Sequence, residues 1–192
     1  MSTPYKPSEI LIRVSPRPGS WKDQAHLQVK VMKVEHGKET ETLKTFDALG
    51  GRPGHRTPHG NHQIGEKTKD ARSSIYGDCV NPKTNGRRHV GNGSSSCKAP
   101  EKYEGAKMPF YTRFTAQAGF HVGSMTTQSH GCIHMEENTA QWIFDNVPKG
   151  TKVIIEPTEP KDRPQIYKHS PKHYEKNQHE RHRHTQTSSR QW

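Results

Sequence analysis

The sequence predicts a mainly β domain that carries one α-helix and is followed by a polar tail. Three observations support this prediction. Short apolar segments recur along most of the chain, and the segment Leu27–Val34 alternates apolar and polar residues, as a strand with one wet face does. A single later segment repeats its apolar residues with helical spacing. Beyond Pro157 the apolar pattern disappears.

The first predicted strands form a meander. Ile10–Val14 and Leu27–Val34 are the two clearest strands, and Thr42–Leu49 continues the meander until the Gly-Gly-Arg-Pro-Gly sequence at 50–54 ends it. Thr57–Ile64 begins with a proline-containing turn and passes into a short strand.

A long polar insertion, from about residue 67 to 106, separates these strands from the next ones. Segments of this length are typical of lids, binding loops or disordered chain. Strand character returns at Phe110–Phe114 and at Gly119–Val122, and Thr151–Glu156 is expected to close the sheet.

The helix is predicted over Glu137–Asn146. Four apolar residues fall at i, i+3, i+4 and i+7 and would form one buried stripe: Ala140, Ile143, Phe144 and Val147. Acidic Glu136 and Glu137 lie near the positive N-terminus of the helix, and Asn138 is a candidate cap.

The tail is expected to be disordered, so the domain is placed at 1–157 and the tail at 158–192. Hydrophobic residues make up only 27% of the chain, and the tail lacks the apolar content that would offset the entropy of ordering it. Its histidines would either bind a metal weakly or belong to a solvated basic segment: His169, His173, His179, His182 and His184.

The segment 129–135, Ser-His-Gly-Cys-Ile-His-Met, is the candidate catalytic element. A cysteine attacks as its thiolate, which nearby positive charge favours, and here His130 and His134 flank Cys132 at two residues on either side. Gly131 would let a substrate carbonyl approach backbone N–H groups closely. The segment therefore favours cysteine acyl transfer, with a buried structural thiol as the alternative.

Three blocks in this order resemble the L,D-transpeptidase catalytic (YkuD-type) domain: Thr57-Pro-x-Gly-x-x-x-Ile64, Gly119-Phe-His121, and Ser129-His-Gly-Cys-Ile133. The closing segment 146–155 matches as well. The resemblance implies an L,D-transpeptidase-like β-sandwich and a cysteine enzyme that acts on the stem peptides of peptidoglycan without a cofactor. Amine acceptors would give 3→3 crosslinks or D-amino-acid exchange, whereas water would give an L,D-carboxypeptidase.

The resemblance assigns roles to individual residues. Cys132 would be the nucleophile and His121 the base, with the backbone N–H groups of Gly131 and Cys132 as oxyanion donors. Ser129 would fix the turn or the orientation of His121. An extended backbone would point His130, Cys132 and His134 to one face, so that His130 lines the site.

Two departures from the family concern the substrate cleft. His134 stands where the family usually has arginine, so it would either contact a substrate carboxylate or fill space. The loop 122–128 between His121 and Cys132 is short, which favours a more open cleft. Tyr111 and Arg113, on one face of their strand, would line the donor side, although Arg113 also fits an ordinary solvated position.

The two remaining cysteines lie in the insertion. With Cys132 as nucleophile, Cys79 and Cys97 could pair as a disulfide, which would imply an oxidising compartment; two free thiols are the alternative. A zinc site made of His121, His130, Cys132 and His134 is the rival reading of the motif, although its spacing is unlike that of structural zinc sites.

The net charge of +11 predicts anionic surroundings, which both nucleic acid and the bacterial envelope offer. No nucleic-acid-binding motif is present, and no apolar run approaches the roughly 20 residues that span a bilayer. The N-terminal residues also lack the apolar core of a secretory signal. We therefore expect action in the periplasm or cell wall, either as a leaderless antibacterial effector with secretion machinery and an immunity protein as partners, or as a wall-biogenesis enzyme whose leader has been removed.

Overall fold

The computed structural model describes residues 5–18 and 25–158. All of its helices and strands belong to one compact unit, Met1–Glu156. The elements, in chain order, are β1 (Ile10–Pro16), β2 (His26–Glu35), β3 (Lys38–Leu49), β4 (Gly60–Gln63), β5 (Lys67–Val80), β6 (Arg87–Val90), the 3-10 helix η1 (Gly93–Ser96), β7 (Lys102–Arg113), β8 (Gly119–Val122), β9 (Ile133–Met135), α1 (Glu137–Asn146) and β10 (Lys152–Ile155). The tail from residue 159 onward, predicted to be disordered, lies outside the described residues.

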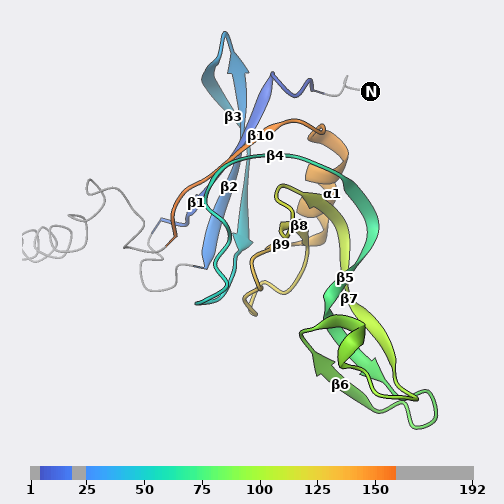
Figure 1. Cartoon of the computed structure of the whole chain (residues 1–192). Helices are drawn as coiled ribbons and strands as arrows, with labels where there is room; N and C mark the ends of the chain where they lie inside the picture. Colours follow the sequence, from blue (N-terminus) through green and yellow to red (C-terminus); the bar gives the residue numbers. More distant parts are fainter. Residues whose placement is uncertain (1–4, 19–24, 159–192) are drawn as a thin grey trace, which may run out of the picture. The chain divides into compact units, whose positions relative to one another are not determined.

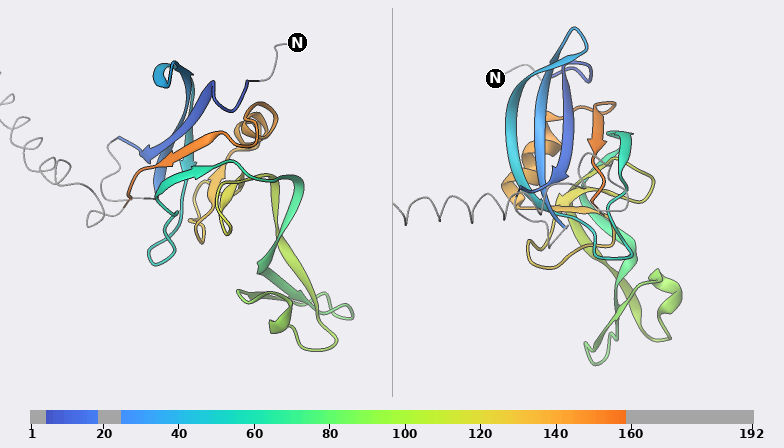
Figure 2. Two further views of the ribbon diagram at one scale, coloured as in Figure 1. Left: turned by 45° about the horizontal axis from the view of Figure 1, so that its top comes forward. Right: turned by 90° about the vertical axis from the view of Figure 1, so that its left-hand side faces the viewer.

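The mainly β fold with one α-helix is confirmed. The strands described form one mixed sheet in the order β4-β10-β1-β2-β3-β9-β8-β7-β5-β6. The layers that we expected of a sandwich are thus parts of a single hydrogen-bonded sheet, which curls around α1 (Figures 1 and 2). Strand β9, which the sequence analysis did not identify, joins the N-terminal meander to β8 and is paired to β3 through Leu49 and His134.

The core lies between α1 and the concave side of the curled sheet. Phe120, Ile133 and Met135 are fully buried beneath the site, and Ala140, Ile143 and Val147 of the predicted helical stripe are buried as well. The predicted cap is wrong: the N-cap residue is Glu136, whose backbone is extended, and Asn138 lies within the first turn. This core fixes the positions of β8 and β9, which carry the motif residues.

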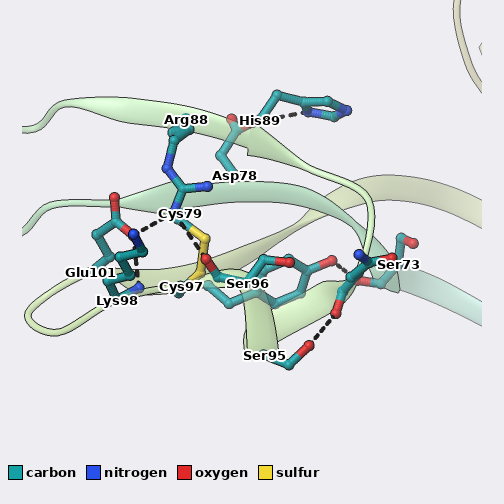
Figure 3. Close-up of a disulfide and its surroundings, with 12 residues drawn as sticks. Ser73, Asp78, Cys79, Arg88, His89, Ser95, Ser96, Cys97, Lys98 and Glu101 are labelled. Carbon is teal, nitrogen blue, oxygen red and sulfur yellow. Dashed lines mark hydrogen bonds and ion pairs between the residues drawn. A yellow bond between two sulfur atoms is a disulfide. The ribbon is translucent and has the colours of Figure 1, made fainter.

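The polar insertion is not the irregular loop that its length suggested. Strands β5 and β7 run side by side as an antiparallel ribbon, with β6 and η1 at its far end (Figure 1). A disulfide joins Cys79 of β5 to Cys97 after η1, with 5.3 Å between the Cα atoms (Figure 3). Polar residues predominate because both faces of this narrow ribbon are largely open to solvent.

Removing the disulfide is expected to lower the free energy of unfolding by about 3 kcal/mol, because the reduced chain regains the entropy of the loop between Cys79 and Cys97. Urea unfolding of the double variant Cys79→Ser/Cys97→Ser measures this effect. Cys132→Ser is the matched control, since it removes a sulfur that closes no loop. Equal stability of the double variant and the control would contradict the prediction.

Candidate active site

The motif residues lie on two neighbouring parallel strands and in the turn that directly precedes the second of them. β8 and β9 pair in a register that sets His121 opposite His134 and Phe120 opposite Ile133. Since Cys132 directly precedes β9, the thiol lies beside Gly119 at the start of β8, and a backbone hydrogen bond links Gly119 to the sulfur. The pairing of β8 with β9 therefore places the segment that ends in Cys132 next to the strand that carries His121.

Ser129 organises the turn before Cys132. Its hydroxyl donates to the carbonyl of Cys132 and accepts the N–H of Gly131. Gly131 has a φ of +121°, which residues with a side chain rarely adopt, so glycine is required here. The backbone of Ser129 is tied to the end of β3, because it accepts from the N–H of Arg52 and donates to the carbonyl of Gly50.

The N–H of Gly131 has a hydrogen-bond partner within the turn. We expected this group to be an oxyanion donor, but it is already bonded to the hydroxyl of Ser129 at 3.0 Å. Among the described residues, both hydrogen bonds of the Ser129 hydroxyl lie within the turn and none reaches His121, so the structure shows Ser129 fixing the turn.

Cys132 is partly exposed, and it is the one cysteine of the three that is not in a disulfide. Burial raises the pKa of its thiol, and the hydrogen bond from the backbone of Gly119 offsets this only in part. Burial therefore works against the thiolate that the flanking imidazoles were expected to favour, and the role of Cys132 as nucleophile stays a prediction.

His121 is buried and is held in one tautomer. Its Nδ1–H donates to the carbonyl of Val122 at 2.8 Å, which leaves the lone pair on Nε2. Desolvation lowers the pKa of His121 to about 4, so the imidazole is neutral at pH 7. A neutral imidazole with a free lone pair can accept a proton, as a general base does.

His134 anchors the short loop that follows β8. Its Nδ1–H donates to the carbonyls of Ser124 and Thr127, at 3.0 and 3.2 Å, and its ring meets that of His121 edge-on with 5.0 Å between centroids. A Cβ at Gly123 would lie 2.4 Å from the ring. His134 thus packs between His121 and the loop. Its expected contact with a substrate stays a prediction.

His130 does not extend the face of Cys132 and His134, because the left-handed conformation of Gly131 interrupts the extended backbone. Its Nε2 lies 2.9 Å from the guanidinium of Arg52, its ring meets the ring of His55 at 5.0 Å, and it stacks on Tyr76 with 4.0 Å between centroids. Sequence reasoning missed Tyr76 and Arg52, since nothing in the local pattern links the polar insertion to the motif.

Tyr111 and Arg113 share one face of β7, as predicted, since Thr112 between them is fully buried. The Tyr111 ring packs on Gly119 and tilts against His121 with 6.2 Å between centroids. Desolvation, and secondarily the Cys132 sulfur, raise the pKa of Tyr111 to about 12. The Arg113 guanidinium lies against Gly65, whereas the effect of Cys132 on the pKa of Tyr111 places Tyr111 near the thiol.

The four residues of the zinc hypothesis do not bring three or more candidate ligand atoms within 4.8 Å of one another. In the described part of the chain, the group of candidate ligand atoms within 4.8 Å of one another is Cys79, Cys97 and Glu101. Its two sulfurs are bonded to each other, and Glu101 is engaged by Arg88 and the N–H of Lys98 (Figure 3).

The sequence profile of the L,D-transpeptidase catalytic domain (YkuD) matches residues 20–155. This match covers most of the chain and includes every motif residue discussed above. The chain belongs to this family. A search of curated proteins by sequence gave no match.

A solved L,D-transpeptidase structure shares the fold. The enzyme from Mycobacterium smegmatis aligns with a TM-score of 0.50 and 20% identity over 78% of this chain and 59% of its own. An L,D-transpeptidase from Stackebrandtia nassauensis aligns with a TM-score of 0.49 and 16% identity, over 82% of this chain and 60% of its own. This L,D-transpeptidase domain thus spans about 60% of each of these two structures. No helix in the described residues is long and apolar enough to cross a membrane.

Proposed function

We propose that this L,D-transpeptidase domain is a cysteine acyltransferase that acts on the tetrapeptide stems of peptidoglycan. The observation that supports it best is the Ser-His-Gly-Cys turn, which hydrogen bonds of Ser129 hold in place. The pairing of β8 with β9 sets this turn next to the strand of His121, whose neutral ring has its lone pair on Nε2. Family membership supplies the substrate class.

In the proposed reaction, His121 Nε2 takes the proton of the Cys132 thiol as the sulfur attacks the carbonyl of the diamino acid, at its L-centre. The backbone N–H of Cys132 is our candidate donor to the oxyanion, because that of Gly131 is occupied. The C–N bond then breaks, His121 returns the proton to the departing amine of D-alanine, and a thioester remains on the sulfur.

The acceptor that resolves the thioester decides the product. Water would give a tripeptide, a D-amino acid would give an exchanged tetrapeptide, and a stem-peptide amine would give a 3→3 crosslink. The partial exposure of Cys132 and the short loop held by His134 support access for water and small amines.

For the biological setting, we propose that the enzyme acts in the periplasm or cell wall, as an antibacterial effector with a cognate immunity protein. The Cys79–Cys97 disulfide supports an oxidising compartment, and the short loop supports the effector type. Growth of a Gram-negative host that makes the protein with and without an added periplasmic leader tests this. Toxicity restricted to the periplasmic form supports an effector, whereas unimpaired growth would favour wall biogenesis.

The chemistry is tested by incubating the protein with disaccharide-tetrapeptide and following the products by mass spectrometry. We expect loss of D-alanine, exchange with added D-amino acid, or a crosslinked dimer. Protein alkylated with iodoacetamide is the matched control, since Cys132 is the one free thiol and alkylation blocks it alone. Unchanged tetrapeptide under all acceptor conditions, or equal turnover by alkylated protein, would refute the proposal.

A further inference from the structure

A cluster made of one guanidinium and two imidazoles adjoins the catalytic turn. Arg52 and His55, from the segment after β3, converge on the exposed His130, with 2.9 Å between the Arg52 guanidinium and His130 Nε2 and 5.0 Å between the two imidazole centroids. Within the residues that the structure describes, none of these three groups is paired with a carboxylate. The cluster thus carries positive charge without a counter-ion from the fold.

The contact between Arg52 and His130 fixes where the protons are. A guanidinium can only donate, so His130 Nε2 accepts, and the ring proton lies on Nδ1. Desolvation, followed by the charge of Arg52, lowers the pKa of His130 and so favours its neutral form. The guanidinium has five donors and uses one on His130, so it can still grip a second acceptor in the bidentate manner typical of arginine and carboxylate.

His130 is held in place by the insertion. Its ring stacks on Tyr76, at 4.0 Å and 20° between the planes. Tyr76 belongs to a bulge in β5, because four residues, 73–76, stand between register pairs that leave one residue of β7 opposite them. Hydrogen bonds hold the bulge in shape: Ser73 Oγ accepts from the N–H groups of Ile75 and Tyr76, and the Tyr103 hydroxyl donates to the Ser73 carbonyl.

Close backbone packing and the disulfide reinforce this bulge. A Cβ at Gly93 would lie 2.3 Å from the Ser74 carbonyl oxygen, and one at Gly105 would lie 2.1 Å from that of Ser73. Cys79, three residues after Tyr76, is bonded to Cys97. The position of Tyr76, on which His130 stacks, is therefore well defined.

We propose that Arg52, His130 and His55 form a carboxylate-binding site that recognises the free C-terminus of the stem tetrapeptide. This inference rests on the proposed function and specifies how the terminal residue is recognised. The scissile bond lies one residue from the C-terminus, so the terminal carboxylate lies within roughly 4 Å, one residue length, of the attacked residue. His130 is two residues from Cys132, so their Cα atoms lie within roughly 7 Å of each other and the cluster adjoins the candidate nucleophile.

The test is a binding measurement in the full chain carrying Cys132→Ala, so that no turnover occurs. The probes are a stem tetrapeptide that ends in D-alanine and the same peptide ending in D-alanine amide. We expect calorimetry to show roughly tenfold tighter binding of the acid, because a charge-assisted hydrogen bond contributes about that much. Arg52→Gln should abolish this preference, and His55→Gln should reduce it.

Lys152→Gln is the control, since it removes the same charge from the exposed part of β10. Equal binding of acid and amide, or an unchanged preference in folded Arg52→Gln and His55→Gln, would overturn the site. If Arg52→Gln does not fold, His55→Gln carries the test. An acid preference in an intact protein that shows no turnover would overturn only the proposed reaction, whereas turnover without the preference would overturn only this site.

Discussion

Cys132→Ala is expected to lower the rate of D-alanine release by roughly 10⁴-fold or more, because no other thiol is free to form the thioester. The side chain is partly exposed and lies outside the fully buried core, so the variant should keep the wild-type melting temperature. The measurement is single-turnover product formation from disaccharide-tetrapeptide, followed by mass spectrometry of the intact protein for the acyl adduct.

A double variant makes the result specific to catalysis. If Cys132 and His121 act as one unit, Cys132→Ala/His121→Asn should be no slower than Cys132→Ala alone. Two rate losses that multiply would show that the residues contribute separately. An acyl adduct that still forms in Cys132→Ala would place the nucleophile elsewhere.

His121→Asn is expected to lower turnover by roughly 10²- to 10⁴-fold, which is the usual contribution of a general base. Asparagine can keep the hydrogen bond to the Val122 carbonyl through its amide but offers no basic nitrogen. His36→Asn is the matched control, because His36 is exposed in the β2–β3 turn and has a positive φ that asparagine tolerates.

The pH dependence gives a second measure of His121. The folded-state pKa of about 4 lies below the unfolded value of about 6.5, so the protein is stabilised by the neutral ring above about pH 6.5 and loses this contribution as pH falls toward 4. Wild-type turnover should persist to about pH 4 if the base alone limits it. A stability profile as steep in His121→Asn as in wild type would contradict the assignment.

The parts of the fold that local patterns determine were predicted well. The helix Glu137–Asn146 and the strand Gly119–Val122 have the bounds expected, because apolar spacing and flanking turn residues define both. The local pattern could not show that the insertion is a ribbon. Most residues of β5 are polar and both of its faces meet solvent, so β5 is defined by its hydrogen bonds to β7 rather than by a buried apolar face.

In the candidate site, too, the residues of the local motif could be predicted and the contacts from distant segments could not. Cys132 and His121 were found as candidates from the motif alone, and their catalytic roles stay predictions. The surroundings of His130 were not found, because Gly131 turns the chain and brings His130 to Tyr76 and Arg52 from distant segments. Only tertiary pairing could reveal that contact.

The parallel ladder between β8 and β9 has a consequence for engineering. The register of the strands, rather than the length of the loop between them, sets where His121 lies relative to Cys132. Residues could therefore be added to the loop 123–128 without moving the reacting groups, provided that His134 keeps carbonyl partners there. We expect such insertions to change which acceptors reach Cys132 while His121 and Cys132 keep their relative positions.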